Sequence, residues 1–382
     1  MRKIYYFKLI STFLLLFLAH SSEAQYKLLS NLGESAFIDI QTHTGKPIVY
    51  SDSLNESLKH QFIAFDFRFG VNSFDRTPQD KILRFPNYGL GFTDYNLHSD
   101  TLGNPIAIYG FFAFPFNKTN FLKYGAELST GVTFNFNKFN IHTNPKNDAI
   151  STAINVYFNL GLWASARLNE RIDVLASTDL THFSNGNIKA PNKGLNLVGG
   201  NLGMRYNFQF AEKNNSFKRK TKNTIEYPDF KPYNELSMWI GIGGKTTVKK
   251  VEFPIVYFCS TISADFLHSY SWIGKYGGGL DIFYDGSLIT EYSNHNSVLY
   301  SQLTFVGLHA GHEFTVANIS LVTQMGVYVW KGMDAKGTFY KRVGLKYYLK
   351  DKLYINLSLK SSIGLRADYI ELGMGHRILW QK

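Results

Sequence analysis

A histidine and a serine stand two residues apart near the middle of the chain, in His182-Phe183-Ser184, and Asn196 follows a short distance later. Nucleophilic acyl transfer needs a serine, a histidine that takes the serine proton and a third group that orients the histidine. The His-X-Ser spacing alone is weak evidence, because most such pairs are incidental residues of a strand. Whether these residues can form a catalytic site therefore depends on the segments that carry them.

Residues 172–184 alternate as a β-strand does, with successive side chains on opposite faces. The even positions are mostly apolar: Ile172, Val174, Ala176 and Leu180. His182 and Ser184 fall on this same face. If the strand belongs to a membrane barrel, that face meets lipid, where polar side chains are costly unless they have a partner or a use.

A second alternating segment, 195–208, places Asn196 on its own apolar face, together with Val198 and Leu202. The stretch 186–194 between the two segments contains Pro191 and two glycines, which is typical of a loop joining antiparallel strands. We therefore expect His182, Ser184 and Asn196 to converge at one end of a hairpin, on the outer wall of a barrel.

The alternation recurs along most of the chain. In 352–360 and 153–168 the apolar face is nearly unbroken over eight or more residues, whereas the outward face of a soluble β-sandwich would be charged. Aromatic residues such as Trp330 and Trp380 stand at or near segment ends, as interface girdles do. These features predict an all-β fold, a transmembrane antiparallel β-barrel of about 14 strands, give or take about two.

The start of the chain resembles an export signal. Arg2 and Lys3 precede a short apolar run, and small residues end the stretch before Gln25, so we predict a cleaved signal peptide over 1–24. With one cysteine, Cys259, the chain can form no internal disulfide. The net charge of +11 favours acidic partners such as phosphorylated lipid, and the export signal argues against nucleic acid.

A polar, basic stretch over 211–233 interrupts the alternation. It could be a domain linker, but the segments after it repeat the same pattern. We therefore predict a single outer-membrane barrel over 25–382, with 211–233 as a long connection within it.

The segment 181–203 resembles the outer-membrane lipid A 3-O-deacylase family of the PagL type. That family's motif has His, any residue, Ser and Asn at a strand end, followed by a loop with Asn and Gly. Here the matching residues are His182, Ser184 and Asn185, then Asn192, Gly194 and Asn196. Family members are barrels that remove an ester-linked acyl chain from lipid A without a metal.

The resemblance implies Ser184 as nucleophile and His182 as general base. It suggests the oxyanion-binding or positioning groups listed here: Asn185, Gly186, Asn187 and Asn192. Lys189 and Lys193 flank the loop and could contact lipid A phosphates. The implied substrate is lipid A, or lipopolysaccharide, taken from outer-membrane lipid with no cofactor and no metal.

Two departures from the family bear on this hypothesis. The best-known members carry a Glu as the group that orients the histidine, where this chain has Asn196. An amide can orient an imidazole but cannot offer it a negative charge. The family's small barrels have about eight strands, so the resemblance leaves the chain after about Ala211 unexplained.

Other functions remain open at this stage: a non-catalytic barrel, either a porin or a pseudoenzyme that keeps the motif, and an adhesin or secretion-linked surface protein. His309 and His312 are three apart on a probable strand, hence on opposite faces, which disfavours a metal site. The oligomeric state is not determined by the sequence.

Strand parity makes one further prediction. If both chain ends are periplasmic, the strand that ends at Ser184 must be odd-numbered to place the site at the outer leaflet, where lipid A resides. We therefore predict an additional strand near Phe37–Gln41.

Overall fold

The computed structural model describes residues 36–48, 52–73, 77–117, 121–208, 229–247, 255–292, 299–349, 352–361 and 367–381. The predicted signal peptide over 1–24 and most of the connection over 211–233 lie outside the described residues, so both stay predictions.

Sixteen strands dominate the described chain. Their bounds are β1 Ala36–Ile48, β2 Phe62–Asn72, β3 Asn87–Asn96, β4 Gly103–Pro115, β5 Leu122–Phe136, β6 Asn155–Arg167, β7 Ile172–Ser184, β8 Leu195–Asn207, β9 Asn234–Lys245, β10 Tyr257–Ser269, β11 Gly274–Asp285, β12 Thr304–Val316, β13 Ile319–Lys331, β14 Phe339–Tyr348, β15 Leu353–Ser361 and β16 Tyr369–Trp380. The helices are single turns: α3 Asp52–Asn55, η1 Glu56–Leu58, α4 Pro78–Ile82, α5 Leu288–Tyr292 and η3 Tyr300–Leu303.

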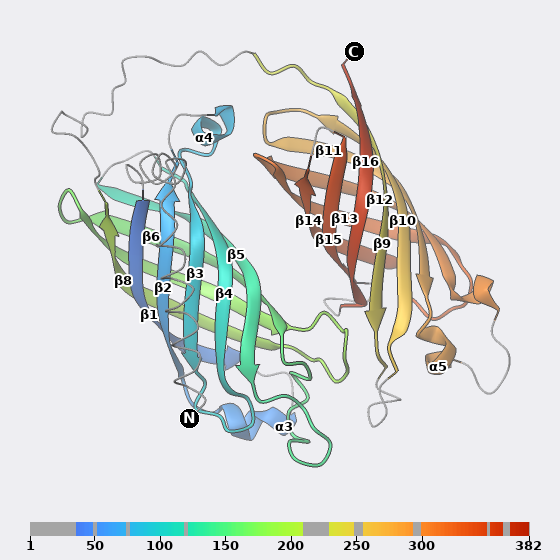
Figure 1. Cartoon of the computed structure of the whole chain (residues 1–382), viewed down its shortest axis with the longest axis horizontal. Helices are drawn as coiled ribbons and strands as arrows, with labels where there is room; N and C mark the ends of the chain where they lie inside the picture. The colour runs from blue at the N-terminus through green and yellow to red at the C-terminus, as the bar shows by residue number, and fades with distance from the viewer. Residues whose placement is uncertain are drawn as a thin grey trace, which may run out of the picture.

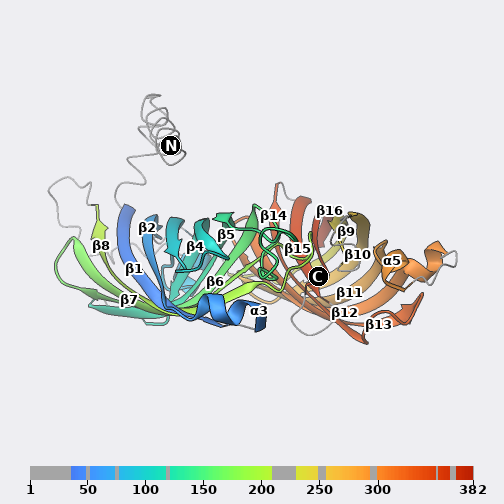
Figure 2. The same ribbon diagram turned by 90° about the horizontal axis from the view of Figure 1, so that it is seen from below.

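The strands close into two antiparallel barrels of eight strands each, β1–β8 and β9–β16 (Figures 1 and 2). The first barrel closes by pairing β1 with β8, and the second by pairing β16 with β9. The predicted all-β fold of antiparallel barrel strands is confirmed, and the total of sixteen strands lies within the predicted range. The predicted single barrel over 25–382 is wrong, because the strands form two closed barrels. Alternation marks which face of a strand meets lipid, but it does not specify the partner with which the last strand pairs.

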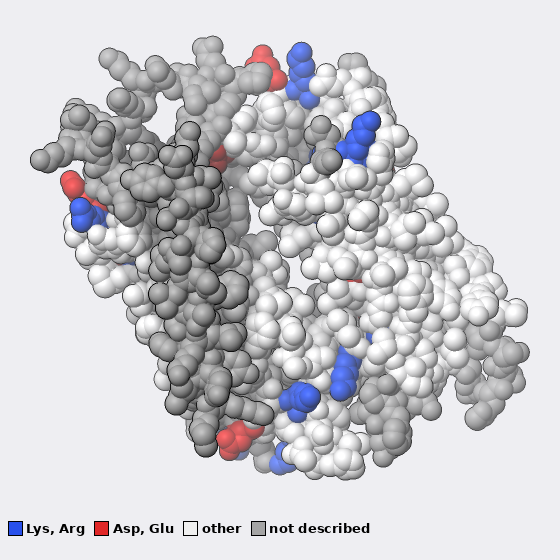
Figure 3. Space-filling model, viewed as in Figure 1, with Lys and Arg blue, Asp and Glu red and all other residues white. Residues whose placement is uncertain are grey.

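The alternation itself is confirmed on both barrels. On β6, Leu162 is 56% exposed while Asn159 is 5% exposed, and on β15 Leu357 is exposed while Asn356 is buried. In the face of the molecule drawn in Figure 3, the charged side chains lie mostly near the two ends, and the band between them is almost free of charge. Such a belt is typical of a barrel wall that meets hydrocarbon.

Both barrel interiors are filled by side chains, as expected for eight strands. In the second barrel Arg342 contacts Glu371 and Asp281, and His309 lies between Asp281 and Asp265. In the first barrel Arg68 pairs with acidic side chains and Arg205 with Asp39, and the cavity among them measures only about 30 Å³. Among the described residues, no helix is long and apolar enough to cross a membrane.

Candidate functional site

The strand that carries Ser184 is the seventh of the chain, because residues 36–48 form β1. The predicted additional strand near Phe37–Gln41 is thus confirmed. An even-stranded barrel brings both ends of its chain to one rim, and β7 ends at the other. We call this other end, where β1, β3, β5 and β7 finish, the Ser184 rim. The long 137–154 connection also lies there, and in outer-membrane barrels the longer loops are external.

His182 and Asn196 face each other across the β7–β8 pair, as predicted. Nδ1 of His182 lies 2.7 Å from Oδ1 of Asn196. Because an amide oxygen accepts, this hydrogen bond places the proton on Nδ1 and leaves Nε2 as the free base. The asparagine therefore fixes the tautomer that could take a proton from a serine.

Gly194 makes room for the histidine ring. It directly precedes β8, whose first residue, Leu195, pairs with Phe183. A Cβ at Gly194 would lie 2.8 Å from Cε1 of His182, and its φ of +74° favours glycine. The ring thus lies against a position that has no side chain.

Ser184 lies on the same face of β7 as His182, one strand repeat away, and its side chain is buried. Two residues on one face of a strand are separated by about 7 Å along it, a gap that an imidazole ring can span. Within the described chain, no hydrogen bond joins the two side chains. Instead the backbone N–H of Gly186 donates to Ser184 Oγ at 3.5 Å. Hydrogen bonds between catalytic groups are often long before substrate binds.

The loop after Ser184 is held mainly by its own amides. Asn185 donates from Nδ2 to Lys189 O and to Ser151 Oγ, and its backbone N–H donates to Asn192 Oδ1. These contacts give Asn185 and Asn192 a role in shaping the loop. Of the predicted oxyanion groups, Gly186 is the one whose N–H is seen to donate to the serine oxygen in the described chain, and Gly186 adopts a left-handed φ of +61°.

The two lysines predicted to contact phosphate differ in their surroundings. Nζ of Lys193 lies 2.7 Å from Asp148 Oδ2, an ion pair that competes with any phosphate. Lys189 contributes its carbonyl to the loop, where it accepts from Ser151 and Asn185. His309 and His312 face opposite sides of β12, as expected: His309 lies inside the barrel and His312 contacts Tyr270 on the outside.

The second barrel contacts the loop that follows Ser184. The sequence did not indicate this contact. Asn187 donates from Nδ2 to Asp368 O at 3.1 Å, Ala190 N–H donates to Thr246 Oγ1 at 2.7 Å, and Thr246 N–H donates to Ile188 O at 3.1 Å. The two barrels therefore lie side by side with corresponding rims together. At the opposite ends Gln79 contacts Trp272 O.

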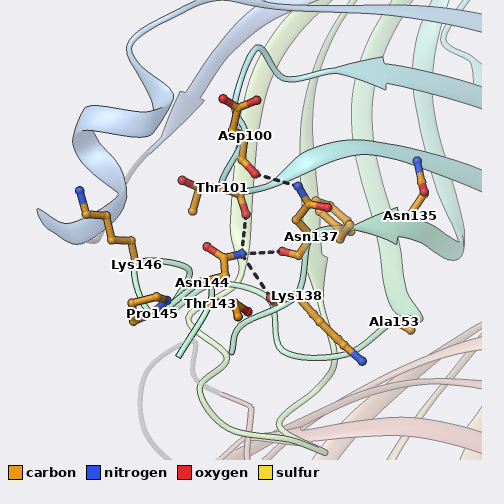
Figure 4. A pocket seen from close by; sticks show the side chains of 11 residues that line it. Asp100, Thr101, Asn135, Asn137, Lys138, Thr143, Asn144, Pro145, Lys146 and Ala153 are labelled. Atoms are coloured by element: carbon orange, nitrogen blue, oxygen red, sulfur yellow. Dashed lines mark hydrogen bonds between the residues drawn. The ribbon is translucent and has the colours of Figure 1, made fainter. Parts of the chain in front are cut away.

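A polar cavity of about 770 Å³ opens on the Ser184 rim (Figure 4). It lies between the β3–β4 connection and the 137–153 segment. Its lining contains amides, hydroxyls, one carboxylate residue, Asp100, and two lysines, Lys138 and Lys146. Sequence reasoning missed this site because its residues come from connections without periodicity.

Two family models match the chain, one on each barrel. Residues 64–205 match "Lipid A 3-O-deacylase (PagL)", and residues 234–380 match "Acyloxyacyl hydrolase, C-terminal domain". Together they span most of the chain, which therefore belongs to the lipid A 3-O-deacylase family. The second match accounts for the chain after the connection, which the 181–203 motif left unexplained. No curated protein matches the chain.

Solved structures similar to the chain include a transporter, a porin and an outer membrane channel, all at low identity. The toluene transporter TodX of Pseudomonas putida is 9% identical, with 92% of this chain and 89% of that chain covered and a TM-score of 0.18. A Rhodopseudomonas blastica porin variant is 8% identical, with 90% and 99% covered and a TM-score of 0.17. An outer membrane channel from P. putida F1 is 11% identical, with 91% and 96% covered and a TM-score of 0.19.

The family and the two closed barrels with apolar outer walls together identify an outer-membrane β-barrel protein. The family is that of the lipid A 3-O-deacylases, and a 3-O-deacylase is an ester hydrolase.

Proposed function

We propose that the protein hydrolyses an ester-linked acyl chain of lipid A by nucleophilic catalysis at the outer wall of the first barrel. The observation that supports this most is the hydrogen bond from His182 to Asn196, two residues from Ser184 on the same face of β7, at the Ser184 rim. There an acyl chain can reach the serine without leaving the bilayer, and the ester carbonyl lies near the headgroup boundary.

The residues have distinct roles in the proposed reaction. Nε2 of His182 takes the proton of Ser184 Oγ as the oxygen attacks the ester carbonyl, and the N–H of Gly186 stabilises the oxyanion. The imidazolium then gives its proton to the departing sugar oxygen, which leaves an acyl-serine. Water, deprotonated by His182, releases the fatty acid and restores Ser184.

The alternative of a porin is disfavoured by the barrel interiors. The lumen of the first barrel contains a cavity of about 30 Å³, the size of a water molecule, and its charged side chains are paired with one another. A lumen filled in this way conducts poorly, so purified protein in planar bilayers should give no porin-like conductance.

The decisive experiment is mass spectrometry of lipid A from cells that express the wild type or Ser184→Ala. The wild type should remove an acyl chain and Ser184→Ala should not. Thr178→Ala is the matched control, because Thr178 is a hydroxyl residue on the same strand and the same outer face. A wild type that leaves lipid A intact would favour a pseudoenzyme, and full activity of Ser184→Ala would place the nucleophile elsewhere.

A further inference from the structure

The second barrel contacts the first barrel at the loop after Ser184. Three hydrogen bonds cross between the barrels there, at Asn187, Ile188 and Ala190, and they end on Thr246 and Asp368. A Cβ at Gly186 would lie 2.3 Å from side-chain atoms of Ile370, so β16 packs directly on this glycine.

The positions that receive these contacts are themselves anchored. Asp368 forms ion pairs with Lys360 and Lys336, and Lys336 also pairs with Asp285. Burial alone would raise the pKa of Asp368, but the two lysines outweigh it and hold that pKa well below its usual value. These ion pairs therefore hold the part of the second barrel's rim that contacts the loop after Ser184.

The backbone conformation of the loop after Ser184 must be stabilised by its neighbours. Gly186 and Asn187 both adopt left-handed φ values, and left-handed geometry costs free energy at a residue other than glycine. The N–H of Gly186 lies beside the serine oxygen. It must stay there to reach the oxyanion, which forms on the ester carbonyl oxygen next to the attacking Oγ, and small displacements of such a donor lower the rate steeply.

We infer that Thr246 and Ile370 of the second barrel are positioning residues for the reaction proposed above, holding the loop after Ser184 so that the Gly186 N–H points at the nucleophile. The inference rests on the proposed function. It gives the second barrel a purpose in catalysis, although the predicted nucleophile and base both lie in the first.

The test measures kcat and KM for lipid A with full-length Thr246→Val, which removes the acceptor for Ala190 N–H but keeps the side-chain shape. Loss of this bond should lower kcat about 3- to 10-fold with little change in KM. Thr246→Ser keeps the hydroxyl and should restore kcat to within about twofold of wild type. Ile370→Ala, which removes the packing on Gly186, should also lower kcat.

Thr304→Val is the matched control, because Thr304 also lies at this rim of the second barrel and its hydroxyl donates to Tyr300 O within that barrel. It should keep the wild-type kcat. Wild-type kcat in both Thr246→Val and Ile370→Ala would overturn the inference, provided that Ser184→Ala is inactive. If wild type and Ser184→Ala are equally inactive, the proposed function fails instead. A lower melting temperature with unchanged kcat would show a merely structural role and also overturn the inference.

The cavity on the Ser184 rim supports a second inference independently. Its walls are fixed by hydrogen bonds: Asn137 donates to Asp100 O at 2.7 Å, and Asn144 donates to Thr101 O at 2.9 Å (Figure 4). Among the described residues, no carboxylate forms an ion pair with Lys138 or Lys146, and both side chains are exposed.

The cavity also adjoins the predicted catalytic loop. Ala153 lines it, and Ser151, two residues earlier, contacts both Asn185 and Lys189. A volume of about 770 Å³ is ample for a saccharide, and amides, hydroxyls and free lysines are the groups that bind sugar hydroxyls and phosphates.

We propose that this cavity binds a phosphorylated saccharide, which under the proposed function is the headgroup of the substrate. The test compares binding of phosphorylated and dephosphorylated lipid A by the Ser184→Ala protein, so that turnover plays no part. Lys138→Gln with Lys146→Gln should weaken binding of the phosphorylated form about 3- to 30-fold and leave the other form unchanged.

Lys46→Gln with Lys59→Gln is the matched control, because these exposed lysines lie near the same rim but outside the cavity. Free glucosamine phosphate as competitor separates recognition of the sugar phosphate from recognition of the lipid: competition supports the cavity as its site. Equal binding by the cavity variant and the control variant would overturn the inference. This binding result stands whether or not the wild-type protein hydrolyses lipid A.

Discussion

The His182–Asn196 hydrogen bond predicts that kcat depends on whether residue 196 carries an amide or a carboxylate. Asn196→Asp replaces an amide with a carboxylate of the same shape, 2.7 Å from Nδ1 of His182. The carboxylate stabilises the imidazolium that forms as the serine proton is taken, whereas the amide only orients the ring.

The size of the effect follows from the type of hydrogen bond. A neutral hydrogen bond contributes about 1 kcal/mol and one to a charged group about 1.5–3 kcal/mol. A difference of about 1 kcal/mol corresponds to roughly a fivefold rise in kcat for Asn196→Asp. Asn196→Leu removes the acceptor and leaves Nδ1–H of His182 without a hydrogen-bond partner. This costs about 1–3 kcal/mol and should lower kcat about 5- to 150-fold.

The assay is release of fatty acid from purified lipid A in detergent, with wild type, both variants and Ser184→Ala measured together. Val198→Ala is the control, because Val198 lies on the same strand face two residues from Asn196. Unchanged kcat in Asn196→Leu would refute the orienting role of Asn196. A slower Asn196→Asp enzyme would show that the imidazolium gains nothing from a charge at this position.

The remaining predictions concern the site, the barrel wall and the interior. Gly194→Ala should lower kcat at least tenfold in the same assay, because its Cβ would meet the His182 ring at 2.8 Å; an unaffected rate would mean the ring can move aside freely. Leu162→Lys should impair insertion by about 2–4 kcal/mol in a vesicle folding assay, while Leu162→Met should not, and equal folding of both would refute the lipid-facing register. Arg342→Met should destabilise the second barrel by about 3–5 kcal/mol in urea unfolding, since it takes a buried cation away from the buried carboxylates of Asp281 and Glu371; wild-type stability would mean the network is dispensable. Because the pKa of Asp368 is depressed, its stabilising contribution is complete above its unfolded pKa near 4 and is lost as the pH falls below it, so melting temperatures of wild type and Asp368→Asn should differ at pH 7 and converge toward strong acid.

The strand faces were predictable from the sequence because lipid imposes a rule on each residue separately. Leu162 and Leu357 had to face outward and Asn159 and Asn356 inward, whatever the partner strand. The structure does change one consequence: in a lumen as tightly filled as this, a lysine at Asn159, which donates to Thr181 Oγ1, would be costly too, so the lumen face is less tolerant than alternation alone suggests.

Part of the candidate site was predictable for the same reason. His182 and Ser184 stand on the mostly apolar face of β7, Asn196 stands on the mostly apolar face of β8, and the β7–β8 register brings His182 and Asn196 opposite each other. The role of Gly194 was not visible, because a glycine in a loop has many explanations until the ring beside it is seen. The catalytic roles stay predictions.

The sequence by itself determined the class of fold, the outward face of each strand and the hairpin that pairs His182 with Asn196, because these depend on neighbours along the chain or on the solvent. Only the tertiary structure decided that the strands close as two barrels, that Thr246 and Ile370 contact the loop after Ser184, and that two connections enclose the cavity beside Lys138. Each of these depends on contacts between segments far apart in the chain. The alternation of apolar and polar residues does not specify which segments make contact.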